Sequence, residues 1–219
     1  MEPNKTAINW QALISTAWEK RRPLWQDSRV DCFRVFHGYE EGSTGTVIEK
    51  FNDAAVIDYK TDIREDLAEL AQALLKVFPF KNIIAKGHQS LGLSLKARTH
   101  ILHGKDTFTT CNEYGLKFKV QLDAPHNPGL YLDARDARSW LSDNSSNRRI
   151  LNLFAFTGSL GLSSAYGKAT EVIHLDRSKE LLPRIQENYQ VNNVEFEARN
   201  FLRGDIYKHL PRAIKAGKK

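Results

Sequence analysis

The sequence predicts an α/β protein whose C-terminal part is built around a parallel sheet. An apolar strand over residues 150–156 breaks at a Thr-Gly pair and continues directly into a helix. A second strand over residues 171–176 ends on the acid Asp176, and a third strand and helix follow after residue 200. Strands and helices that alternate in this way form a Rossmann-like sheet, in which ligands bind beyond the carboxyl ends of the strands.

Three parts are expected along the chain. In chain order they are an N-terminal amphipathic helix within residues 1–28, a small α+β domain over 29–125 and an incomplete Rossmann-like domain over 126–219. Helical spacing of Trp10, Ile14 and Trp18 predicts the first helix over residues 6–20, with Thr6 as its cap. Its apolar face is expected to pack on the domain that follows.

The small domain is predicted to contain an antiparallel sheet and one helix, and to contribute to substrate or RNA binding. The helix begins at Asp62, where Glu65 completes an acidic capping box, and it stops before Pro79. Strands rich in β-branched and aromatic residues over 30–39, 46–51 and 54–59 are expected to form this antiparallel sheet. Two further strands are expected over 82–85 and 99–102, followed by a hairpin over 107–122 that turns at 113–115.

The glycine spacing after the first Rossmann-like strand argues against a dinucleotide ligand. A dinucleotide site needs G-x-G-x-x-G, which lets the backbone approach a pyrophosphate, but this loop offers only Gly158-x-x-Gly161. The run Asn152-Leu-Phe154-x-x-Thr157-Gly158 instead resembles motif I of class I S-adenosylmethionine (SAM) methyltransferases, whose cofactor carries an adenosine without phosphate. The fold class implied is the first half of a Rossmann-like SAM-methyltransferase sheet.

The resemblance implies roles for two acids. Asp176 would bind the ribose hydroxyls, although a loop acid at this position could also cap the next helix. Asp205, in the segment 200–205, would contact the adenine amino group or, alternatively, cap the helix that follows. The residues placed by the resemblance around the methionine end of SAM are Asn152, Phe154, Thr157 and Gly158.

The segment upstream of motif I narrows the resemblance. Residues 128–135, Pro-Gly-Leu-Tyr-Leu-Asp-Ala-Arg, and the hairpin before them are similar to the G-L-F-L-D-x-R signature and hairpin of the RlmI/RlmK-like rRNA methyltransferase group. This similarity implies methylation of a base in ribosomal RNA. Arg135 could bind the methionine carboxylate of SAM, with Asp133 and Tyr131 beside it, or could be an exposed arginine in the first turn of a helix.

Composition is consistent with an RNA partner but identifies no catalytic group. The net charge of +6 favours an anionic partner. Cys32 and Cys111, the only cysteines, are too far apart in sequence to indicate a disulfide framework or a zinc site, so no metal and a reducing cytoplasm are expected. His174 and His209 have no catalytic partner at a meaningful spacing. No apolar stretch is long enough to span a membrane.

The chain is expected to be a truncated SAM-dependent methyltransferase. It ends before motif IV, so the strand over residues 150–156 is predicted to be an exposed edge that promotes self-association. The chain is also expected to have no turnover of its own. Two alternatives stay open. One is a small-molecule methyltransferase of the same fold, and the other is a non-catalytic protein that binds RNA or a nucleoside.

Overall fold

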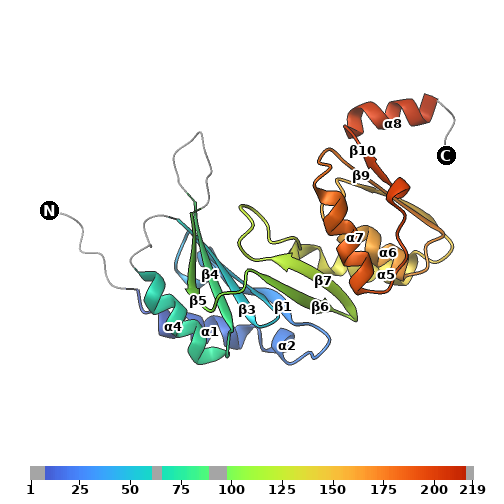
Figure 1. The fold of residues 1–219 in the computed structure, drawn as a ribbon. Coiled ribbons are helices and arrows are strands. Elements are labelled where there is room, and N and C mark those ends of the chain that lie inside the picture. Colours follow the sequence, from blue (N-terminus) through green and yellow to red (C-terminus); the bar gives the residue numbers. More distant parts are fainter. Residues whose placement is uncertain (1–7, 61–65, 89–97, 216–219) are drawn as a thin grey trace. The chain divides into compact units, whose positions relative to one another are not determined.

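A computed structural model of the chain shows two compact units (Figure 1). The structure describes residues 8–60, 66–88 and 98–215. The first unit comprises residues 1–113 and 120–128, and the second comprises residues 114–119 and 129–219. No helix within the described ranges is long and apolar enough to cross a membrane.

The first unit contains a five-stranded mixed sheet. Its strands, in spatial order, are β1 (Cys32–His37), β2 (Thr46–Phe51), β3 (Ala54–Lys60), β4 (Asn82–His88) and β5 (Arg98–His103). All neighbours are antiparallel except β3 and β4, which are parallel. The three strands predicted to form an antiparallel sheet, β1, β2 and β3, do so, and β4 joins them in parallel with β3. A helix, α4 (Leu67–Val77), separates β3 from β4 in the chain and returns it to the same end of the sheet, which makes the pair parallel.

The N-terminal helix α1 (Trp10–Lys20) begins later than predicted. Asn9 is its N-cap, because the Asn9 side chain accepts a hydrogen bond of 3.1 Å from the backbone N–H of Ala12. Thr6, the expected cap, lies outside the described residues, as do Asp62 and Glu65 of the expected capping box. The first strand also ends earlier, at His37, where a short helix, α3 (Gly38–Glu41), follows.

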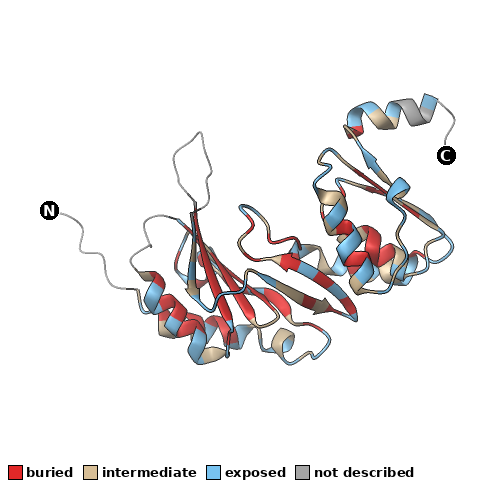
Figure 2. Cartoon of the chain, viewed as in Figure 1, coloured by how far each residue is buried: buried red, intermediate tan, exposed pale blue. Residues whose placement is uncertain are grey.

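The core of the first unit lies between the sheet and the helices α1 and α4, as the buried residues in Figure 2 show. Trp18 is central to it, because its ring contacts those of Phe33, Phe78 and Phe80 at centroid distances of 5.9, 5.6 and 6.3 Å. The apolar face of α1 is thus a packing face, as the helical spacing predicts. A second short helix, α2 (Arg22–Trp25), follows α1 directly.

The predicted hairpin is confirmed as β6 (Phe108–Glu113) and β7 (Leu116–Gln121). Its turn residues Tyr114 and Gly115 both have positive φ, 52° and 89°. Two consecutive left-handed residues make the primed turn that matches the twist of a two-stranded ribbon, and glycine adopts this conformation without strain.

The second unit contains the predicted half of a Rossmann-like sheet. The parallel strands β8 (Arg149–Leu153), β9 (Glu171–Asp176) and β10 (Phe201–Arg203) lie in the order β10-β9-β8. Strand β8 is an edge of this sheet, as predicted, and Leu151 on it is 48% exposed. The helical elements of the unit are η2 (Leu132–Ala134), α5 (Arg135–Asn144), α6 (Ser159–Tyr166), α7 (Leu181–Val191), η3 (Ala198–Asn200) and α8 (Ile206–Lys215).

Two local details of this unit concern the ends of its helices. The polar stretch 142–147 is helical up to Asn144 because α5 continues into it. Glu180 stands at the N-cap of α7. Pro183 is the third residue of α7, where its missing N–H would have no partner within the helix, so it is accommodated without a break.

Candidate functional site: the loop after strand β8 and the acid after strand β9

The loop between β8 and α6 has an unusual backbone. Phe154 and Phe156 have φ values of 53° and 50°, and Gly158, the N-cap of α6, has φ 79°. Left-handed aromatic residues are uncommon, and a cluster of such residues points to a functional loop. The loop is fixed by hydrogen bonds from the N–H of Ala155 to the carbonyl of Leu175, at 3.2 Å, and from the N–H of Gly158 to the carbonyl of Ala155, at 2.8 Å.

Asp176 is held against this loop at the carboxyl end of β9. Its Oδ2 accepts a hydrogen bond from the N–H of Phe156 at 3.0 Å, and its Oδ1 accepts one from the N–H of Ser178 at 3.1 Å. A carboxylate has about four lone-pair sites, so two backbone donors leave acceptor capacity on both oxygens. Asp176 can therefore orient the loop and accept from two hydroxyl groups of a ligand at once.

Exposed aromatic surface lies beside this acid. Phe154 is 66% exposed and Tyr131 is 51% exposed. The Tyr131 ring contacts that of Phe156 at a centroid distance of 5.3 Å, so the segment 128–135 reaches the same loop. A ligand with an apolar ring and a diol, such as a nucleoside, fits aromatic faces that adjoin a carboxylate with free acceptor capacity.

Thr157 lies behind the loop. It is fully buried, and its hydroxyl donates a hydrogen bond of 2.5 Å to the carbonyl of Gly129. The carbonyl of Thr157 accepts 3.0 Å from the side-chain amide of Asn188 on α7. These contacts join the segment 128–135, the loop and α7 into one support for the exposed face.

A buried polar network that the sequence did not predict supports the same strands. His174 on β9 is fully buried, and its Nδ1 lies 3.1 Å from the side-chain nitrogen of Asn152 on β8. Its Nε2 lies 2.9 Å from the hydroxyl of Tyr189 on α7. Because the amide nitrogen of Asn152 is a donor, Nδ1 accepts and Nε2 carries the proton that is donated to Tyr189.

Burial keeps His174 neutral and lowers its pKa to about 4. Burial also raises the pKa of Tyr189. Asn152 is thus placed within this network beneath the loop. Asn152 on β8 is paired in register with His174 on β9. Only the alignment of the two strands relates these residues, because they are far apart in the sequence.

Gly161 on α6 packs directly on the His174 ring. A Cβ at this position would lie 2.3 Å from Cε1 and 2.9 Å from Nε2 of His174. The absence of a side chain at Gly161 therefore lets α6 approach β9 closely and leaves the bond between His174 and Tyr189 intact.

Gly161→Ala is expected to destabilise the chain by about 1–3 kcal/mol, because the added methyl overpacks against His174. Urea unfolding followed by circular dichroism measures the change. Helix propensity alone predicts the opposite sign, a gain of roughly 0.5–1 kcal/mol. In a His174→Ala background the two closest contacts of the methyl are removed and only Val172 Cγ1, at 3.0 Å, remains, so the loss should be smaller. An equal loss in both backgrounds would show that the clash with His174 is not the cause.

The remaining predicted residues lie around the start of α5 and at the start of α8. Arg135 is the first residue of α5 and is half-buried, and Asp133 is exposed in the turn before it. Asp205 accepts a 2.9 Å hydrogen bond from the N–H of Tyr207, so it caps the first turn of α8. The N–H of Gly204 donates a hydrogen bond of 2.8 Å to the carbonyl of Asp176, which links this segment to the end of β9.

A further residue, Arg138, is buried and donates a hydrogen bond of 2.8 Å to the carbonyl of Tyr131.

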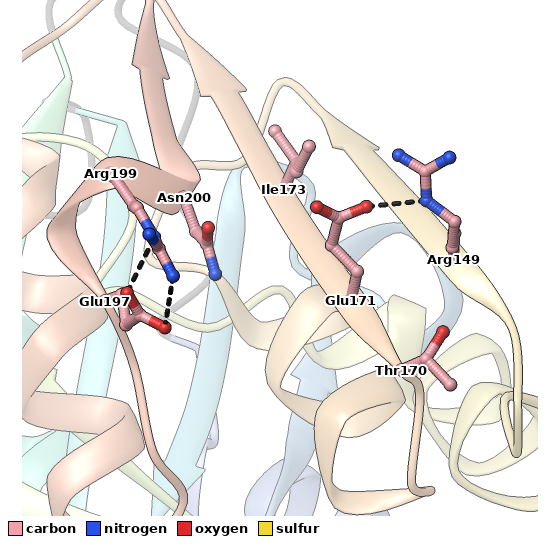
Figure 3. A pocket seen from close by; sticks show the side chains of 7 residues that line it. All are labelled: Arg149, Thr170, Glu171, Ile173, Glu197, Arg199 and Asn200. Carbon is pink, nitrogen blue, oxygen red and sulfur yellow. Dashed lines mark hydrogen bonds and ion pairs between the residues drawn. The ribbon is translucent and has the colours of Figure 1, made fainter.

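A separate pocket lies at the opposite end of these strands (Figure 3). Arg149 and Glu171, the first residues of β8 and β9, form an ion pair of 2.6 Å there, and Arg199 and Glu197 form another of 2.7 Å. Rossmann-like sheets bind ligands at the carboxyl ends of their strands, and this pocket is at the amino ends. It is therefore not the nucleoside site.

The parallel sheet, the glycine-containing turn into α6 and the acid after β9 define a Rossmann-like nucleoside-cofactor domain. Residues 87–219 match the family described as S-adenosylmethionine-dependent methyltransferases. The chain belongs to this family, and the cofactor of the family is SAM, as the resemblance of the loop to motif I implies.

Curated relatives are similar over nearly all of the chain. Ribosomal RNA large subunit methyltransferase I of Aeromonas salmonicida is 30% identical over 211 residues, which cover 94% of this chain and 53% of the relative. The protein of the same name from Aliivibrio fischeri is 31% identical over 202 residues, covering 90% of this chain and 51% of the relative. The chain thus spans about half the length of the curated relatives it matches.

Solved structures show the same fold. A candidate SAM-dependent methyltransferase from Streptococcus mutans superimposes with a TM-score of 0.86 at 19% identity, covering 98% of this chain and 57% of that one. A candidate methyltransferase complexed with SAH, the product form of SAM, gives a TM-score of 0.85 at 20% identity over the same shares of the two chains. The predicted fold class is therefore confirmed.

Proposed function

We propose that the chain binds SAM beyond the carboxyl ends of β8 and β9 and serves the methylation of a base in ribosomal RNA. The observation that carries the cofactor site is the Asp176 carboxylate, which two backbone N–H groups hold beside a loop with exposed aromatic rings. The substrate class is supported by the relatives, which are named ribosomal RNA methyltransferases, and by the net charge of +6.

Each residue of the site has a distinct proposed role. Asp176 accepts hydrogen bonds from the ribose hydroxyls, while Tyr131 and Phe154 cover the apolar parts of the cofactor. Asp205 lies on a segment bonded to the end of β9 and is proposed to reach the adenine. Five residues are proposed for the methionine end of SAM. Asn152 and Thr157 support the loop, and Gly158 stands at the N-cap of α6. Arg135 and Asp133 are proposed to bind the carboxylate and the amine of the methionine.

SAM supplies an electrophilic methyl group when it is bound, and the chain positions it. The loop and Asp176 hold the adenosine. These contacts, although far from the reacting atom, thereby orient the methyl group. The cytoplasm is the proposed location, because the proposed substrate is ribosomal RNA.

Transfer of labelled methyl groups tests this function. We expect the gene product, incubated with methyl-labelled SAM and unmodified large-subunit ribosomal RNA, to place label on the RNA. An Asp176→Ala variant, which lacks the proposed ribose contact, is the control for transfer that does not depend on the site. Label on small molecules but never on RNA would favour a small-molecule methyltransferase, and RNA binding without transfer would favour a non-catalytic binding protein.

A further inference from the structure

The two cysteines of the chain meet in the first unit, on neighbouring segments. Val30 and Glu113 form an antiparallel bridge, and the N–H of Asp31 donates 3.1 Å to the carbonyl of Asn112. The same register continued by two residues places Cys32 opposite Cys111. Side chains at such directly opposed positions point to the same face of the two strands. The two cysteines are therefore close in space, although their separation in sequence argued against a metal site.

A carboxylate completes a compact group of donors. One ligand atom each from Asp31, Cys32 and Cys111 lies within 4.8 Å of the other two. The thiol of Cys32 also lies 3.5 Å from Oε1 of Glu113. Both cysteines are fully buried, and Glu113 is 3% exposed. Two buried sulfurs thus lie with the partly exposed carboxylate of Asp31 in one corner, and the carboxylate of Glu113 adjoins Cys32.

We infer that Cys32, Cys111 and Asp31 form a structural site for one zinc ion, with Glu113 beside the fourth position. Tetrahedral zinc has bonds of about 2.3 Å to sulfur and about 2.0 Å to oxygen, so neighbouring donors lie roughly 3.5–3.8 Å apart. The contact between Cys32 and Glu113 already has this length, and the donor atoms of Asp31, Cys32 and Cys111, which lie within 4.8 Å of one another, would have to close by at most roughly 1 Å. Sulfur and carboxylate together select zinc over magnesium or calcium, which take oxygen ligands.

Charge balance permits the ion in this corner. Zinc enters as a dication, and the two thiols each release one proton to become thiolates, so the net charge of the corner is unchanged. Lys50 adjoins this corner, and its Nζ donates to two backbone carbonyls, that of Asp31, at 2.9 Å, and that of Asn52. Asp31 keeps one oxygen for a metal, because only its Oδ1 accepts from the N–H of Asn112, at 2.7 Å.

The ion would link β1 to β6 of the hairpin, and both of these segments belong to the first unit. Its role is therefore to stabilise this unit, and it does not depend on the SAM site. Metal binding to the folded chain alone raises its stability by mass action.

Cobalt titration tests the site, because thiolate ligation gives Co²⁺ a charge-transfer absorption that oxygen ligation does not. The chain is purified with a phosphine reductant, stripped of metal and titrated with Co²⁺ and then Zn²⁺. We expect one equivalent of Co²⁺ to give the thiolate band, and one equivalent of Zn²⁺ to abolish it and raise the melting temperature.

Three variants make the result specific. Cys32→Ser with Cys111→Ser should lose the band, and Asp31→Asn should keep it but weaken affinity by about tenfold or more. Asp53→Asn, which removes a surface ion pair to Lys81 in the same unit, should change neither. A folded, reduced chain that gives no thiolate band, or a chain whose mass shows the cysteines joined as a disulfide despite the reductant, would overturn the inference. Both the absorption band and the mass are measured on the unsubstituted chain, so the test holds even if a variant fails to fold.

Discussion

Asp176→Ala is expected to weaken SAM binding by at least about tenfold. The carboxylate is proposed to accept from two ribose hydroxyls, and each hydrogen bond to a charged group contributes about 1.5–3 kcal/mol. The substitution also removes the two acceptors that hold the N–H groups of Phe156 and Ser178, so the loop loses its anchor. Isothermal titration calorimetry with SAM on the chain measures both effects together.

Two further variants separate the ribose contact from the loop anchor. Glu171→Ala removes an acid from the opposite end of the same strand, where it pairs with Arg149, and should leave SAM affinity unchanged. Asp176→Asn keeps one acceptor oxygen but places an amide where a backbone N–H donates, so its affinity should fall between the other two. If Asp176→Ala bound SAM as tightly as Glu171→Ala, the acid would have no part in the site.

The elements that the sequence predicts well are those with strong local signals. The alternation of strand and helix after residue 149 and the acid at the end of β9 both appear as expected. The hairpin turn at Tyr114 and Gly115 was also predictable, because glycine after a polar or aromatic turn residue marks a left-handed pair. In each case neighbouring residues alone determine the local structure.

Features that depend on strand pairing were not predictable in the same way. The parallel pairing of β3 with β4 follows from the crossover by α4, and the separate strand patterns do not contain it. The meeting of Cys32 with Cys111, and of Asn152 with His174, depends on registers between segments distant in the chain. The resemblance to a family motif therefore predicts the candidate cofactor-binding residues. The residues that hold them in place are evident only from the structure.

The stability of the chain is expected to fall as the pH is lowered from 7 to 4, by about 3 kcal/mol from His174 alone. The pKa of His174 is about 4 in the folded chain, because the ring is buried, and about 6.5 when the chain is unfolded. Between these values the unfolded chain binds a proton that the folded chain does not. Acid therefore favours unfolding, and the contribution of this group is fully present above about pH 6.5.

His174→Gln isolates this contribution from the other six histidines and the carboxylates. Glutamine cannot titrate, yet it offers a donor and an acceptor to Tyr189 and Asn152. Urea unfolding of both proteins at a series of pH values gives the difference in their free energies of unfolding. We expect the original chain to be the more stable at pH 7 and its advantage to shrink by about 3 kcal/mol towards pH 4. A difference that stays constant with pH would mean that His174 has the same proton affinity in both states, and that its burial does not hold it neutral.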